Sequence, residues 1–83
     1  MNFEKLNVIK LSNGKKIIIL EKIEYKNTTY LYVDDVNDDE TDTLDNYYIM
    51  KINQNGTLSK EENVNLLTEV IPLFNKKLKD SYN

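Results

Sequence analysis

The sequence contains no cysteine, no histidine and no arginine, and it has only two glycines and one proline. Without cysteine the chain has no disulfide framework, no thiolate nucleophile and no cysteine-based zinc site. Without histidine it lacks the commonest metal ligand and the commonest general base near neutral pH. All eleven basic residues are lysines, whereas the planar fork of arginine is preferred for binding phosphate and guanine. These absences argue against an enzyme and against direct nucleic-acid binding, and we expect no cofactor.

Long apolar runs are also missing. The longest one is Ile17–Leu20, which is far too short to cross a bilayer, and the N-terminus has no apolar stretch of signal-peptide length. We therefore expect a cytoplasmic protein that does not contact a membrane. The 83 residues predict a single domain, 1–83, close to the smallest size at which one core is stable without disulfides or metal.

The clearest pattern that is present lies at the C-terminal end and predicts a helix over about residues 60–80. Ser59 and Glu62 have the spacing of a capping box at its start. Pro72 interrupts the pattern, so we predict one helix kinked before Pro72, with two separate helices as the alternative. Apolar residues recur at spacings of three and four and form one stripe, which consists of Val64, Leu67, Ile71, Phe74 and Leu78.

The rest of the chain reads as strands separated by turns. Asn13-Gly14 predicts a hairpin with a type I′ turn, in which both central residues have positive φ. The apolar alternation along 16–25 changes phase, which predicts a β-bulge near Glu21–Lys22. The turns are too short for crossover helices, so the strands must pair in antiparallel fashion. The predicted strands are Val8–Leu11, Lys16–Tyr25, Thr29–Val33, Tyr47–Ile52 and a short Thr57–Leu58.

Together these elements predict an α+β domain, in which an antiparallel meander of four to five strands is covered on one face by the C-terminal helix. The sequence leaves open which face of the sheet the helix covers. The expected core consists of Val8, Ile17, Ile19, Leu31, Val33, Ile49, Ile52, Val64, Leu67, Ile71, Phe74 and Leu78.

Negative charge is concentrated in one segment, the predicted loop 34–46, which has seven acidic residues and no basic one. The first interpretation is a solvated loop that keeps the chain soluble. The second is weak cation binding, but Glu40 and Asn46 do not fit the spacing of a calcium loop, so we assign no metal site. The third is mimicry of nucleic-acid charge in a partner's basic groove. The candidate contact residues are Asp34, Asp35, Asp38, Asp39, Glu40 and Asp42.

Six tyrosines are the second unusual feature. Strands favour tyrosine, so a structural role accounts for much of this content. Tyrosine is also enriched at interfaces, and an open sheet face that carries Tyr30, Tyr32 and Tyr47 would dock a partner or a second copy of the chain. No serine has a histidine partner, so no catalytic residue is assigned.

The order of these segments resembles a group of short, strand-rich, uncharacterised proteins of Gram-positive bacteria and their phages. The resemblance lies in the strand and turn pattern and the closing helix, and it implies a sheet-plus-helix fold without a known activity. It is carried by Leu-Ser-Asn-Gly-Lys (11–15), Ile-Glu-Tyr (23–25), Tyr-Leu-Tyr-Val (30–33), Tyr-Tyr-Ile-Met-Lys-Ile (47–52) and Leu-Phe-Asn-Lys-Lys-Leu (73–78).

The sequence therefore favours a non-catalytic binding module that docks a protein partner through the tyrosine-bearing face or a sheet edge, with a homodimer as one form of this. The alternative is an acidic decoy, of the kind that phages encode, which inhibits a nucleic-acid-binding protein. Neither interpretation needs a cofactor or a metal.

Overall fold

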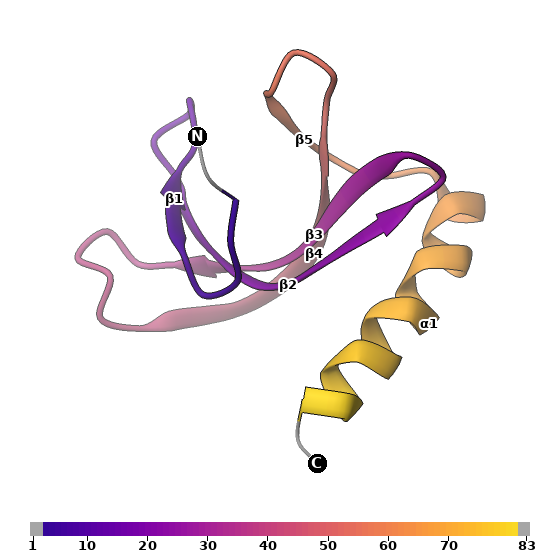
Figure 1. The fold of residues 1–83 in the computed structure, drawn as a ribbon. Coiled ribbons are helices and arrows are strands. Elements are labelled where there is room, and N and C mark those ends of the chain that lie inside the picture. The colour runs from indigo at the N-terminus through magenta and orange to yellow at the C-terminus, as the bar shows by residue number, and fades with distance from the viewer. Residues whose placement is uncertain (1–2, 82–83) are drawn as a thin grey trace.

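The computed structural model describes residues 3–81, which form one curled antiparallel sheet and a single C-terminal helix (Figure 1). The predicted α+β class and meander are confirmed, because each strand pairs with the next one along the chain. The elements are β1 (Val8–Lys10), β2 (Lys16–Tyr25), β3 (Thr28–Val36), β4 (Thr43–Ile52), β5 (Leu58–Lys60) and α1 (Val64–Ser81).

A β-bulge divides β2 into two halves. The register of β2 against β3 shifts between Ile19 and Glu21, so Leu20 is the extra residue. Successive side chains of a strand point to opposite faces, and the extra residue therefore puts Ile19 and Glu21 on different faces of the sheet. The bulge predicted near Glu21–Lys22 is confirmed one position earlier. The first half of β2 thus faces one hydrophobic cluster and the second half faces another.

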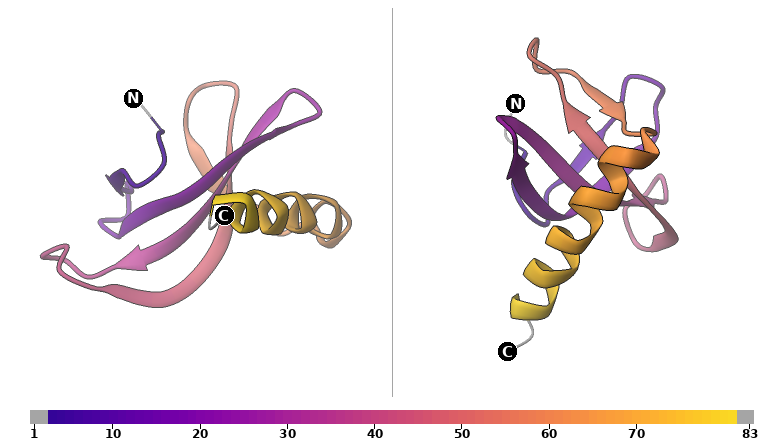
Figure 2. Two further views of the ribbon diagram at one scale, coloured as in Figure 1. Left: turned by 60° about the horizontal axis from the view of Figure 1, so that its bottom comes forward. Right: turned by 90° about the vertical axis from the view of Figure 1, so that its right-hand side faces the viewer.

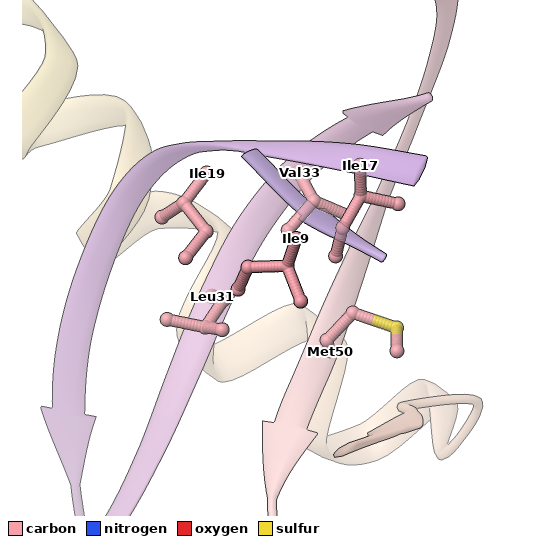
Figure 3. Packing of buried hydrophobic residues seen from close by; sticks show 6 residues of the cluster. All are labelled: Ile9, Ile17, Ile19, Leu31, Val33 and Met50. Carbon is pink, nitrogen blue, oxygen red and sulfur yellow. The ribbon is translucent and has the colours of Figure 1, made fainter. Parts of the chain in front are cut away.

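The first of these, the inner cluster, is enclosed by the sheet itself. Two strands separate β1 from β4 in the sheet, yet Ile9 of β1 and Met50 of β4 belong to the same cluster, so the sheet must curl over its inner face. Figure 3 shows these side chains gathered between β1, β2, β3 and β4. The inner cluster consists of Ile9, Ile17, Ile19, Leu31, Val33 and Met50.

The second cluster, the outer cluster, lies on the opposite face, where α1 packs against the sheet (Figure 2). Tyr30 alternates with Leu31 along β3, which is why the two residues fall into different clusters. The sequence predicted one core beneath the helix, whereas the curled sheet also encloses a core without it. The outer cluster consists of Ile23, Tyr30, Ile49, Val70 and Phe74.

The helix packs on the sheet with one edge of the predicted stripe, which includes Phe74, and with Val70 beside it. Val70 is 0% exposed and Phe74 is 2% exposed, whereas Val64 is 70% and Ile71 is 44% exposed. The expected core positions Val64 and Ile71 are therefore wrong, as is Val8, which is 39% exposed. The apolar surface of α1 is wider than its contact with the sheet, so periodicity alone could not select the buried side.

The turns also differ from the prediction in one respect. Gly14 has φ +89°, but Asn13 is not in the positive-φ region, so Asn13-Gly14 does not form a type I′ turn. Instead, Gly14 N donates to Leu11 O at 2.9 Å, and the glycine takes the left-handed position after the turn. The two-residue hairpin turn with both φ values positive is Lys26-Asn27, between β2 and β3.

The acidic connection is shorter than predicted and well ordered by hydrogen bonds. β3 extends to Val36 and β4 begins at Thr43, so residues 37–42 replace the predicted loop 34–46. The Asn37 side-chain oxygen accepts from the backbone N–H groups of Thr41 at 2.9 Å and Asp42 at 3.1 Å. This local side-chain-to-backbone bonding is typical of asparagine in turns.

The helix begins at Val64 and is capped by Asn63, not by Ser59. Asn63 Oδ1 accepts from Leu66 N at 3.1 Å, which is the usual N-cap geometry. Ser59 belongs to β5, because Glu61 N still donates to Ile49 O of β4 and the strand pairing delays the helix. α1 continues through Pro72 as one helix, so the two-helix alternative is wrong. The kink at Pro72 stays a prediction.

Candidate functional site: the cleft between the edge strands

The structure places the three candidate tyrosines in different environments on the outer face. Tyr30 is buried beneath α1 and is 5% exposed. Tyr32 is half-buried, with its ring centroid 5.8 Å from that of Phe74 and 5.9 Å from that of Tyr47. Tyr47 is 50% exposed. The three tyrosines were expected together on an open face, whereas α1 covers Tyr30 and leaves Tyr47 exposed.

The candidate acidic residues also separate into two groups. Asp34 and Asp35 are buried in β3 on opposite faces of the sheet. Asp34 Oδ1 accepts from Asn46 N at 2.9 Å, which joins β3 to β4. Lys16 Nζ contacts Glu40 at 3.0 Å, so this carboxylate is paired. The members of the exposed group, which lie in the connection 37–42, are Asp38, Asp39, Glu40 and Asp42.

A cleft of about 510 Å³ opens at the inner face, and it is lined by both edge strands of the sheet. We call it the β1–β5 cleft. In Figure 1, β1 and β5 rise on opposite sides of the curled sheet. Ile9 and Leu11 line the cleft from the β1 side, and Leu58 lines it from β5. Its floor includes Tyr48 and Met50 of β4, so the cleft is a solvent-facing continuation of the inner cluster.

One buried carboxylate, that of Asp35, stands in the wall of this cleft. Tyr48 Oη donates to Asp35 Oδ1 at 2.7 Å, and Asn46 Nδ2 donates to Asp35 Oδ2 at 2.6 Å. Burial acts to raise the pKa of Asp35, but these two hydrogen bonds and the nearby Lys15 and Lys60 outweigh it, so the pKa is below its ordinary value. Burial, followed by the bond to Asp35, raises the pKa of Tyr48. Asp35 is therefore an ionised acceptor at neutral pH.

The rim of the cleft is basic. Its lining includes Lys10, Lys15 and Lys60 against the single carboxylate of Asp35, which gives three positive charges, one negative charge and a net charge of +2. The whole chain has a net charge of −3. Lys60 Nζ lies 5.2 Å from the centroid of the Tyr48 ring, which holds the ammonium group over the cleft wall. The cleft is thus a locally positive, partly apolar surface on an acidic protein.

Sequence reasoning did not find this site. Its residues come from the N-terminal segment, from β1 and the turn after it, from the end of β3, from β4, from the β4–β5 turn and from β5, and no short motif connects them. The acidic pattern did single out Asp35, but as one of the contact residues of the predicted loop 34–46 and not as part of a cleft. Only the curl of the sheet brings the three lysines of the rim together.

A second charged cluster has a structural role. Glu21, at the bulge, is 4% exposed and lies 3.2 Å from Lys5 Nζ and 3.8 Å from Lys77 Nζ. Burial acts to raise the pKa of Glu21, but the backbone N–H of Lys22 and the two lysines lower it below its ordinary value. Glu21 thus links the N-terminal segment, β2 and α1.

Among residues 3–81, no group of three or more acidic, histidine or cysteine side chains is placed to hold a metal ion. The described part of the chain has no helix that is both long and apolar enough to cross a membrane. No family model matches the chain, and no curated protein and no solved structure matches it. Function is therefore inferred from the site itself.

Proposed function

We propose that the protein is a non-catalytic binding module that holds an extended, acidic segment of a partner protein in the β1–β5 cleft. The observation that carries this proposal is the position of the cleft between two edge strands, each of which pairs with only one strand in the described sheet. An exposed sheet edge binds an extended peptide by adding it as a further strand. Main-chain hydrogen bonds then supply affinity, and pockets for alternate side chains supply specificity.

The chemistry of the lining defines the ligand. Leu11, Leu58 and Tyr48 are half-buried and form an apolar surface that alternate side chains of an extended segment would cover. Lys15 and Lys60 flank this surface and would attract carboxylates between those apolar side chains. A segment that alternates apolar and acidic residues matches both features.

The test is an NMR titration of the labelled protein with two synthetic peptides of equal length. One peptide alternates valine with glutamate, and the other alternates valine with lysine. We expect the acidic peptide to shift the amide signals of Leu11, Tyr48 and Leu58 and to leave those of α1 in place. Binding should weaken as salt is added, because the lysines are at the surface.

Lys60→Glu supplies the decisive variant, and Lys26→Glu is its matched control. Lys26 Nζ lies 5.3 Å from the centroid of the Tyr25 ring, nearly the geometry of Lys60 over Tyr48, but Lys26 does not line the cleft. Lys60→Glu should raise the Kd of the acidic peptide by about tenfold or more, and Lys26→Glu should change it little. Equal effects of the two variants, or no shift at the cleft, would overturn the proposal.

The acidic decoy remains a second candidate because the connection 37–42 projects from the end of the β3–β4 hairpin (Figure 1). Asp38, Asp39 and Asp42 are exposed there, although the burial of Asp34 and Asp35 removes two carboxylates from the expected row. The basic peptide distinguishes the candidates. Shifts confined to residues 37–42 on addition of that peptide would favour the decoy over the cleft module.

A further inference from the structure

One flank of α1 carries apolar side chains that the sheet leaves open to solvent. Val64 is 70% exposed and Ile71 is 44% exposed, and Leu78 in the last turns is half-buried. Leu67, also half-buried, borders this flank and packs against the outer cluster. The helix contacts the sheet mainly through Val70 and Phe74, which are buried. An exposed apolar row along a whole helix is a common sign of an interaction surface.

The spacing of this row is that of a helix–helix seam. Val64, Leu67, Ile71 and Leu78 lie along one side of α1. Together with Phe74, which packs against the sheet and is not part of the open row, they follow one another by alternate steps of three and four residues, which is the a/d pattern of a coiled coil. Four residues beyond Val64 and Ile71, on the solvent side of the row, lie Thr68 and Asn75. Both are uncharged, so neither places a charge beside the row that burial would have to remove from water.

We propose that this row is an interface between two copies of the chain, whose α1 helices pair in antiparallel orientation with Ile71 near the two-fold axis. Ile71 lies close to the middle of the helix, which is about 27 Å long. In this arrangement Val64 of one copy lies opposite Leu78 of the other. A two-fold axis makes such a contact occur twice with the same residues.

Charge complementarity favours a second copy of the chain as the partner and an antiparallel orientation of the two α1 helices. Glu62 is exposed just before the helix, and Lys79 is exposed in its last turn. An antiparallel pair places each Glu62 near Lys79 of the other copy and opposes the two helix dipoles. A parallel pair would instead place Lys79 against Lys79 and align the dipoles unfavourably.

The interface would leave the proposed peptide site free, although it does not depend on that site. α1 covers the outer face of the sheet, whereas the β1–β5 cleft opens at the inner face. A dimer would therefore present two open clefts. Such a dimer would bind a partner with two acidic segments more tightly than a single copy would.

Sedimentation equilibrium of the full chain over a wide range of concentrations tests the proposal. We expect the apparent mass to rise with concentration from 9.8 kDa towards twice that value. Ile71→Lys should raise the dimer dissociation constant by about tenfold or more, since it buries a charge at the centre of the seam. Leu73→Lys is the matched control: Leu73 is 40% exposed, close to the exposure of Ile71, but outside the row.

Val64→Lys changes the same row at a residue that is still more exposed, so this variant should fold normally. A weaker dimer of Val64→Lys would therefore report loss of the interface and not loss of folding. Lys79→Glu and Glu62→Lys should each weaken the dimer, and the two changes combined should restore it. If the protein is a monomer at every concentration, the proposal is overturned, and only a different protein could cover the row. Equal weakening by Ile71→Lys and Leu73→Lys would overturn it as well.

Discussion

The inner and outer clusters share the same central strands but are enclosed in different ways. The inner cluster is aliphatic apart from Met50 and is closed by the curl of the sheet, so the hairpins alone bring its members together. The outer cluster contains Tyr30 and needs α1, which follows all five strands in the chain, as its cover. The comparison shows that the helix stabilises a sheet that already has a core.

The way α1 is attached to the sheet explains why mutations in the two clusters should destabilise different parts of the protein. The helix is anchored by Val70 and Phe74 and by Lys77, whose Nζ donates to Lys22 O at 2.6 Å and lies near Glu21. Much of its remaining apolar surface stays exposed. A helix with so few buried contacts is the kind of element that opens before the sheet does.

The largest expected effect comes from truncating one buried residue in each cluster. Leu31→Ala in the inner cluster should lower the free energy of unfolding by about 2–5 kcal/mol. Val70→Ala in the outer cluster should lower it by about 2 kcal/mol, since fewer buried groups are lost. Urea denaturation gives both values. Hydrogen exchange should show faster opening of α1 than of β3 for Val70→Ala, and equal opening of both would contradict the comparison.

Removing the charge of Glu21, which links the N-terminal segment, β2 and α1, should lower the free energy of unfolding by a smaller amount. Glu21→Gln should cost about 1–2 kcal/mol at neutral pH, because a buried charged acceptor is lost. The folded state lowers the pKa of Glu21, so its contribution is complete above the ordinary value of 4.5 and is lost as the pH falls through the folded value.

The measurement is the free energy of unfolding between pH 7 and pH 3, and Glu24→Gln is the control, because Glu24 is exposed in the same strand. Glu21→Gln should make the free energy of unfolding fall less between pH 7 and pH 3, whereas Glu24→Gln should leave this pH dependence unchanged. An unchanged pH profile for Glu21→Gln would show that this link contributes nothing.

The smallest effect concerns the start of α1. Asn63→Ala should destabilise the protein by about 1 kcal/mol through loss of the N-cap, and Ser59→Ala should have a smaller effect. Thermal unfolding followed by circular dichroism would compare the two variants. If Ser59→Ala lowered the stability more than Asn63→Ala does, the result would contradict the Asn63 cap and favour the capping box that the sequence predicted.

Local patterns were enough to predict most of the elements. The turn residues and β-type runs located the strands, the broken alternation in 16–25 located the bulge, and the spacing of apolar residues predicted the helix. The boundaries were less accurate. Asp34 and Asp35 resemble loop residues by composition, but β4 supplies them with hydrogen-bond partners that composition cannot reveal. The expected exposure of Tyr30 is wrong for a similar reason, since α1 covers it, whereas Tyr47 is exposed.

By itself, the sequence determined the class of the fold, because hairpin turns and helical periodicity depend on residues close together in the chain. The tertiary structure alone decided which side of α1 is buried and that Lys10, Lys15 and Lys60 share one rim. Both outcomes follow from the curl of the sheet, which depends on twist and packing summed over all five strands. Contacts between distant segments of this kind leave no mark on any short stretch of the chain.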